Sequence, residues 1–188
     1  MGMPDLARIW TREEVLALPD DGNRYELVDG ELLVSPSPSG IHQRAILGLF
    51  RLIDPYVRAN RIGAVSIAPA DLDLGSGQVV QPDLFVGAMV AGREPIEWAE
   101  FGIPVLVVEI LSPNTYRHDR LTKRRRYQRS LVPDYWLVHP ESRLVETWTP
   151  ASEEPTTLTE TLRWHPNPAL PPLTIDLPTY FKELWAES

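Results

Sequence analysis

The chain has 188 residues, 43% of them hydrophobic, which indicates a single globular domain over residues 1–188 with its own core. It contains no cysteine, which excludes disulfides and thiolate metal sites, so any metal must bind through carboxylate or imidazole groups. The net charge of −8 argues against indiscriminate nucleic-acid binding. No run is long enough to span a membrane and Met1–Trp10 does not resemble a signal peptide, so we expect a cytoplasmic protein without a membrane partner.

Local signals predict the elements of the N-terminal part. Thr11-Arg-Glu-Glu14 is a capping box and predicts a short helix that ends by Pro19. Residues 25–34 fit two strands joined by a tight turn at Asp29-Gly30. From about Gly40, apolar residues recur at helical spacing, which predicts a helix that Pro55 kinks or shortens near its end. Its apolar stripe contains Ile41, Ala45, Ile46, Leu49, Phe50, Ile53 and Val57.

The middle of the chain is predicted to contain strands. Residues 65–74 alternate loosely as a strand, and a turn at residues 75–77 leads into residues 79–83. Residues 87–102 are expected to form a connector with a turn of helix near its end, around Glu97–Glu100. Val105–Val108 is an unbroken apolar run; such a run also occurs in buried helices, but the prolines that flank it favour a buried strand.

The C-terminal part begins with a predicted helix over residues 118–131. Strands are expected at residues 134–138 and 144–149, followed by a polar loop over residues 150–160. The tail, residues 173–185, is expected to supply a short strand and a final helix that cap the core.

Two acidic residues stand beside apolar strand sequence. Asp83 directly precedes Leu84-Phe85-Val86, and Glu109 directly follows Val105–Val108. A buried carboxylate is costly unless a partner or a metal meets it, so the two acids predict a shared hard cation such as Mg²⁺. The alternative is that each acid is paired with an arginine for structure alone. Within the predicted hairpin, we expect Glu26 to be solvated.

The predicted helix after Glu109 is strongly basic. Seven of the 18 basic residues fall between Arg117 and Arg129, and Lys123 is one of only two lysines beside sixteen arginines. On a helical wheel Lys123 lies on the bulky side with Tyr127 and would point inward. The basic residues predict either a surface that faces nucleic-acid phosphates or an ordinary solvated helix face. The candidate phosphate contacts are Arg117, Arg120, Arg124, Arg125 and Arg126.

The order of these elements resembles the restriction-endonuclease-like superfamily, and more closely the Uma-type family of small bacterial proteins regarded as endonucleases. The resemblance implies an α+β fold with a central mixed β-sheet flanked by helices and an N-terminal β-hairpin. It covers about residues 10–150 and is carried by residues 25–32 (YELVDGEL), His42-Gln43, Gln81-Pro-Asp-Leu84, residues 107–115 (VVEILSPNT), Asp119, Lys123, Tyr127 and Pro133-Asp-Tyr-Trp136.

The resemblance also implies a site and an activity. The superfamily signature is Pro-Asp, then Asp or Glu, any residue and Lys; here the last position is Leu111, and the Uma-type pattern places the lysine on the next helix, at Lys123. The implied metal ligands, for Mg²⁺ or Mn²⁺, are Asp83 and Glu109. Lys123 is the implied catalytic cation. Glu31 and His42 are implied as further members of the catalytic site.

The implied reaction is endonucleolytic hydrolysis of phosphodiester bonds in nucleic acid, with DNA favoured over RNA. A homodimer or a higher homo-oligomer is left open. The alternative function is that of a domain with the nuclease fold that binds nucleic acid or a protein partner without cutting.

Overall fold

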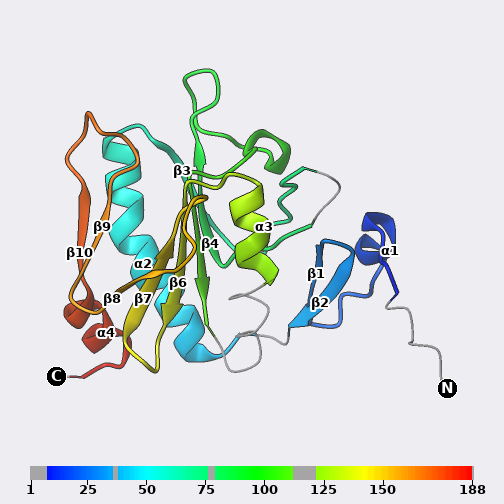
Figure 1. The fold of residues 1–188 in the computed structure, drawn as a ribbon, viewed down its shortest axis with the longest axis horizontal. Helices are drawn as coiled ribbons and strands as arrows, with labels where there is room; N and C mark the ends of the chain where they lie inside the picture. Colours follow the sequence, from blue (N-terminus) through cyan, green and yellow to red (C-terminus); the bar gives the residue numbers. More distant parts are fainter. Residues whose placement is uncertain (1–7, 36–37, 76–78, 112–121, 188) are drawn as a thin grey trace.

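The computed structural model describes residues 8–35, 38–75, 79–111 and 122–187, and a mixed six-stranded sheet forms its centre (Figure 1). The strand order is β3-β4-β5-β6-β7-β8. Within this sheet β5 and β6 are parallel, and the other neighbouring strands are antiparallel. The strands are β3 (Gly63–Ile67), β4 (Leu84–Ala88), β5 (Leu106–Ile110), β6 (Asp134–His139), β7 (Leu144–Trp148) and β8 (Thr156–Leu158). The predicted α+β fold with a central mixed sheet is confirmed.

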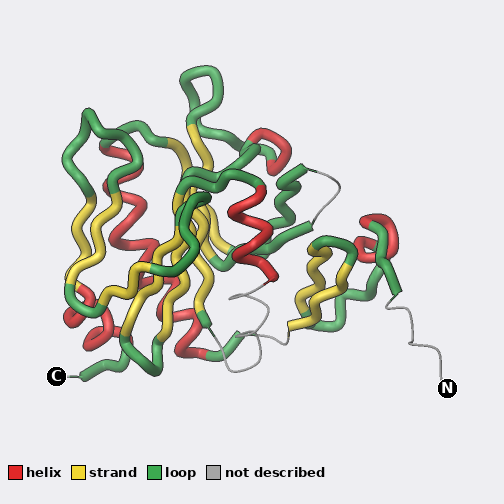
Figure 2. Tube along the Cα trace, viewed as in Figure 1, coloured by secondary structure: helices red, strands yellow, loops and turns green. Residues whose placement is uncertain are grey.

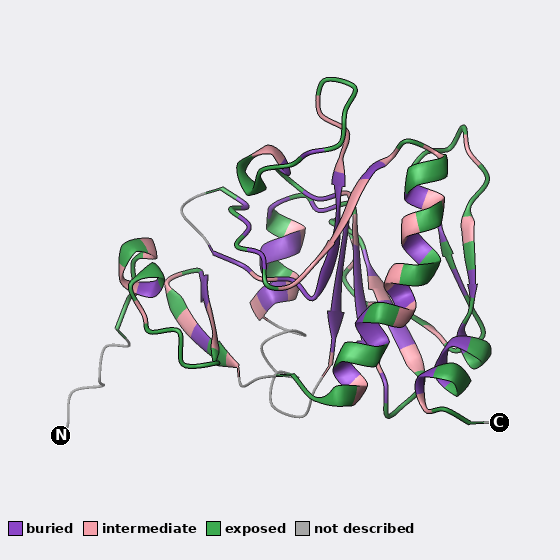
Figure 3. Cartoon of the chain, turned by 180° about the vertical axis from the view of Figure 1, so that it is seen from behind, coloured by how far each residue is buried: buried purple, intermediate pink, exposed green. Residues whose placement is uncertain are grey.

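Helices cover both faces of this sheet. The long helix α2 (Gly40–Ala59) and the C-terminal helix α4 (Leu177–Leu184) pack on one face, and Figure 3 shows the buried stripe of α2 turned toward the strands. Helix α3 (Arg124–Arg129) lies on the other face. Because successive strand residues point to opposite faces, Val108 and Trp136 contribute to the core under α2, whereas Val107 and Tyr135 contribute to the core under α3. None of the described helices is long and apolar enough to cross a membrane.

An N-terminal unit lies beside the main sheet (Figure 2). Helix α1 (Arg12–Leu16) has the predicted capping box, with both reciprocal hydrogen bonds between Thr11 and Glu14. Strands β1 (Arg24–Val28) and β2 (Glu31–Ser35) form the predicted hairpin. Its turn residues have positive φ angles, 51° at Asp29 and 85° at Gly30, which is the geometry that favours Asp-Gly at this position. Leu27 joins the hairpin to the rest of the protein through two backbone hydrogen bonds with Val79.

Helix α2 contains the whole predicted stripe and continues through Pro55 to Ala59, since burial up to Val57 outweighs the one hydrogen bond that proline removes. Two other predicted boundaries were wrong. The strand expected over residues 65–74 is β3, which ends at Ile67. Residues 150–160, expected to be a loop, contain the edge strand β8.

Among the remaining elements, some were predicted and one was not. The turn of helix expected near Glu97–Glu100 is present as η1 (Trp98–Glu100). Strand β9 (Thr161–Trp164) was not predicted, and it pairs with β10 (Leu173–Asp176), the expected strand of the tail. The helix predicted over residues 118–131 falls partly outside the described residues, and its described part is α3.

The pairing of β3 with β4 requires a glycine at position 63. A Cβ atom added at Gly63 would lie 1.7 Å from the backbone oxygen of Gly87 on β4, whereas one added at Gly40 would meet nothing within 4 Å. We therefore expect Gly63→Ala to lower the free energy of unfolding by about 1–3 kcal/mol or more, because the backbone must move. Gly40→Ala is the matched control and should not destabilise the protein. Urea unfolding measures both, and equal stabilities of the two variants would contradict the predicted clash.

Candidate active site

Asp83 and Glu109 meet on the face of the sheet that α3 covers. The antiparallel register of β4 and β5 pairs Leu84 with Val108, so one further step places Asp83 opposite Glu109. Both acids are buried, with 2% and 1% of their surfaces exposed. The Asp83 side chain also accepts a hydrogen bond from the backbone N–H of Ile110 on β5, at 2.8 Å from Oδ2. This side-chain contact holds Asp83 against β5 just before the start of β4. The acids are thus neighbours on one face, as the hypothesis of a shared cation requires.

Asp83 is held by groups from two other elements. The Arg24 guanidinium of β1 donates to Oδ1 at 2.7 Å, and Nε2 of His42, in the first turn of α2, lies 3.0 Å from Oδ2. Burial alone raises the pKa of Asp83, but the hydrogen bond to His42 and the charges of His42, Arg24 and Lys123 outweigh it, so this pKa lies well below its ordinary value. Asp83 is therefore ionised at neutral pH.

Glu109 is held from α3 and from the residue that precedes it. The hydroxyl of Tyr127 donates to Oε1 of Glu109 at 2.8 Å, and the Lys123 ammonium lies 3.2 Å from the same oxygen. Lys123 is only 3% exposed, so the prediction that it points inward is confirmed. Burial, together with the negative charges of Glu109 and Glu26, raises the pKa of Tyr127 well above its ordinary value. Its hydroxyl therefore stays protonated and serves as a donor.

Glu26 is a member of this cluster that was not predicted from the sequence. The prediction that it is solvated was wrong, because it is fully buried on β1. Its Oε2 lies 2.7 Å from the Lys123 ammonium, in an ion pair without hydrogen-bond alignment, and its Oε1 accepts from the backbone N–H of Gln81 at 2.8 Å. Strand alternation gave no signal for this, because Leu27 and Val28, which point to opposite faces of β1, are both buried.

Glu31 lies outside the buried cluster. It is exposed on β2 and borders a surface cavity of about 200 Å³, together with Val28, Asp29, Thr122, Arg125 and Arg129. The structure thus joins Asp83, Glu109, Lys123 and His42 from the predicted site, adds Arg24 and Glu26, and leaves Glu31 at the surface.

The predicted phosphate contacts separate into different environments. Arg126 is buried, and its Nη2 donates to the backbone oxygens of Leu74 and Gly75, at 3.2 and 2.6 Å. The Arg124 guanidinium stacks on the ring of Trp148, 4.4 Å from its centroid. Arg125 is exposed. Arg117 and Arg120 lie outside the described residues.

The buried carboxylates fit a hard divalent cation in their donor chemistry. Mg²⁺ takes oxygen ligands and is usually bound by one or two carboxylates, with water and substrate phosphate completing the shell. Asp83 and Glu109 meet that requirement. No set of three or more histidine, aspartate and glutamate side chains among the described residues is arranged to hold a metal ion. The oxygens of both acids are also in contact with cations, Arg24 on Asp83 and Lys123 on Glu109.

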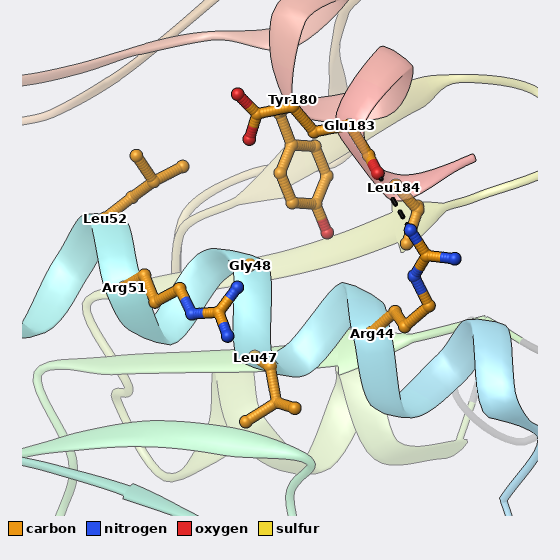
Figure 4. Close-up of a pocket in the computed structure, with 8 residues that line it drawn as sticks. All are labelled: Arg44, Leu47, Gly48, Arg51, Leu52, Tyr180, Glu183 and Leu184. Atoms are coloured by element: carbon orange, nitrogen blue, oxygen red, sulfur yellow. Dashed lines mark hydrogen bonds between the residues drawn. The ribbon is translucent and has the colours of Figure 1, made fainter. Parts of the chain in front are cut away.

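A surface cavity of about 300 Å³ lies elsewhere, between α2 and α4 (Figure 4). Its walls include Leu47, Leu52 and Tyr180, and Arg44 donates across it to the backbone oxygen of Glu183 at 3.1 Å. It contains none of the buried acids. Since α2 and α4 pack on the face of the sheet opposite Asp83 and Glu109, this cavity is separate from the acidic cluster.

Comparisons with known proteins agree with this fold. The crystal structure of a "putative nuclease belonging to DUF820" from Anabaena variabilis ATCC 29413 is similar to this chain with a TM-score of 0.65 and 20% sequence identity. The alignment covers 93% of this chain and 99% of that chain, and at this identity it shows a shared fold. A search of curated proteins finds no match. Residues 12–178 match the Uma2 family, described as "Putative restriction endonuclease". The chain therefore belongs to the Uma2 family.

Proposed function

We propose that the protein is an endonuclease that hydrolyses phosphodiester bonds with Mg²⁺ or Mn²⁺. The observation that carries this proposal is the meeting of Asp83, Glu109 and Lys123, two carboxylates and an ammonium, on one face of the sheet. The description of the Uma2 family and the nuclease name of the similar crystal structure support the same chemistry.

Asp83 and Glu109 would hold the metal ion. When bound, the ion would supply a Lewis acid and an activated water for attack on the phosphate. The other residues of the site prepare these ligands: Arg24 and His42 orient the Asp83 carboxylate, and Tyr127 orients Glu109 through its hydroxyl. Ligands that are oriented in advance require little reorganisation during the reaction.

Lys123 would stabilise the negative charge that develops on the phosphate. A preorganised ammonium in a water-poor site lowers the energy of such a transition state. The requirement for lysine is specific, since an ammonium is a compact charge that fits between two carboxylates, whereas a guanidinium is a broad planar fork.

The proposed substrate is nucleic acid, with DNA favoured. Arg125 is exposed and borders the surface cavity that Glu31 also lines. Arg129 of the same helix borders this cavity too, but its guanidinium pairs with Asp29. We leave Arg126 out of the proposed nucleic-acid surface because its guanidinium contacts backbone oxygens of the protein.

A second candidate function is that of a domain that binds nucleic acid or a protein without cutting. It is favoured by the ion pairs in which Arg24 and Lys123 already contact both acids, because such pairs are also formed by acids with only a structural role. Metal binding separates the two functions, since only the endonuclease requires it.

Asp83→Asn is expected to abolish Mg²⁺ binding and cleavage, since the amide has the shape of the acid without its charge. Isothermal titration calorimetry of Mg²⁺ into the wild type and the variant measures this. Asp73→Asn removes an exposed carboxylate and should bind as the wild type does. Unchanged Mg²⁺ affinity in a folded Asp83→Asn protein would favour the non-cutting alternative.

Lys123→Ala is expected to lower the cleavage rate about a hundredfold, which corresponds to about 3 kcal/mol in the barrier, while metal binding remains. Lys123→Arg should also be slow. Leu111 shares the face of Glu109, so adding Leu111→Lys to Lys123→Ala should return part of the activity. Cleavage of a sensitive substrate is measured for all variants, with Lys182→Ala as the control for loss of a lysine. Wild-type cleavage by Lys123→Ala would remove Lys123 from the mechanism.

Arg125→Gln is expected to reduce the salt dependence of nucleic-acid binding by about one unit of slope, because one phosphate contact and its released counterion are lost. Arg126→Gln should instead lower the stability of the fold, because Arg126 bonds to the oxygens of Leu74 and Gly75. Binding titrations at several salt concentrations, with urea unfolding of both variants, measure this. The same slope for Arg125→Gln as for the wild type would make Arg125 an ordinary solvated charge.

A further inference from the structure

We propose that Glu26 is a positioning residue that holds the Lys123 ammonium in the site, an inference that rests on the proposed endonuclease function. The Glu26 and Lys123 side chains are only 1% and 3% exposed, and their charged atoms lie 2.7 Å apart. This distance is shorter than the 3.2 Å between the same ammonium and Glu109. A buried ammonium requires a counter-charge, and Glu26 supplies the nearer one.

Glu26 is itself fixed to the segment that carries a proposed metal ligand. Its Oε1 accepts from the backbone N–H of Gln81, two residues before Asp83. One carboxylate therefore spans from the start of the Asp83 segment to the ammonium of Lys123. The position of Lys123 relative to Asp83 depends on this bridge.

The two carboxylates that contact Lys123, those of Glu26 and Glu109, have different proposed roles. Glu109 is a proposed metal ligand. Its Oε1 already accepts a hydrogen bond from the Tyr127 hydroxyl and forms an ion pair with the Lys123 ammonium. Glu26 has no metal role in the proposed mechanism, so it can serve as a counter-charge for Lys123 throughout the reaction.

Glu26→Gln is the variant that tests the contact most cleanly. The amide oxygen can still accept from the Gln81 N–H, so the link to the Asp83 segment is kept, while the charge that faces Lys123 is lost. Glu26→Asp keeps the charge but shortens the side chain by one methylene, and is expected to give an intermediate effect. Glu146→Gln is the matched control, since Glu146 is a buried glutamate on β7 that pairs with His139.

Competitive amine labelling, read by mass spectrometry, reports on Lys123 without any need for activity. The chain has two lysines, and the exposed Lys182 is an internal reference in the same molecule. In the metal-free wild type, Lys123 should be labelled much more slowly than Lys182. We expect Glu26→Gln to raise the labelling of Lys123 relative to Lys182 by about tenfold or more. This is the fold-change that corresponds to the free energy of one lost contact with a charged group. Glu146→Gln should leave the ratio unchanged.

A double-mutant cycle on the cleavage rate tests whether Glu26 acts through Lys123. Glu26→Gln alone is expected to lower kcat about a hundredfold, as Lys123→Ala does, with KM little changed. In the Lys123→Ala background, Glu26→Gln should cause no further loss, because its target is already absent. A merely structural role would lower the rate in both backgrounds.

The two measurements also separate failure of this inference from failure of the proposed function. If the wild type cuts no nucleic acid with either metal, the endonuclease proposal fails, and the labelling ratio still decides whether Glu26 holds Lys123. Equal Lys123 labelling in the wild type and in Glu26→Gln would overturn the positioning role. The positioning role would also be overturned if Glu26→Gln lowered the cleavage rate by the same factor in the wild type and in Lys123→Ala. If Glu26→Gln does not fold, Glu26→Asp carries both measurements, with smaller changes in the same directions.

Discussion

The buried ammonium of Lys123 is the interaction on which the arrangement of the site depends. Removing an ammonium from water costs several kcal/mol, and only close counter-charges offset that cost. Here the counter-charges come from two distant parts of the chain, Glu26 on β1 and Glu109 on β5. The hairpin, the central sheet and the start of α3 are therefore joined through one charged group.

The Asp83 carboxylate has a parallel arrangement, in which Arg24 and His42 provide the partners. These contacts hold the pKa of Asp83 well below its ordinary value and keep it ionised, which its proposed role as a metal ligand requires. Burial acts in the opposite sense on Tyr127, whose raised pKa keeps its hydroxyl available as a donor to Glu109. The same low-polarity environment thus maintains an anion at one position and a neutral donor at another, and the neighbouring charges decide which form each group takes.

The basic stretch shows that a run of like charges in sequence is not a single surface in space. A helix distributes consecutive residues around its axis, so neighbouring arginines meet different surroundings. Arg126 turns inward to backbone oxygens, Arg124 lies on Trp148, and Arg125 remains exposed. The inward position of Lys123 follows from the same geometry, and it explains how a lysine on this element reaches the acid of a neighbouring strand.

The sequence by itself determined the parts of this protein that depend on near neighbours in the chain. The capping box at Thr11, the Asp29-Gly30 turn, the apolar stripe of α2 and the apolar strand before Glu109 are local patterns, and each folds as predicted. The candidate acids were found for the same reason, since a carboxylate beside an apolar run is visible without a structure. The tertiary structure decided which polar groups join them. Whether a glutamate in a hairpin is solvated or buried depends on a lysine far along the chain, so Glu26 and Glu31 look alike in sequence but have opposite environments. Strands β8 and β9 contain threonine and tryptophan, which favour strands, but they are only three and four residues long. Segments this short form strands only where partners across the sheets pair with them.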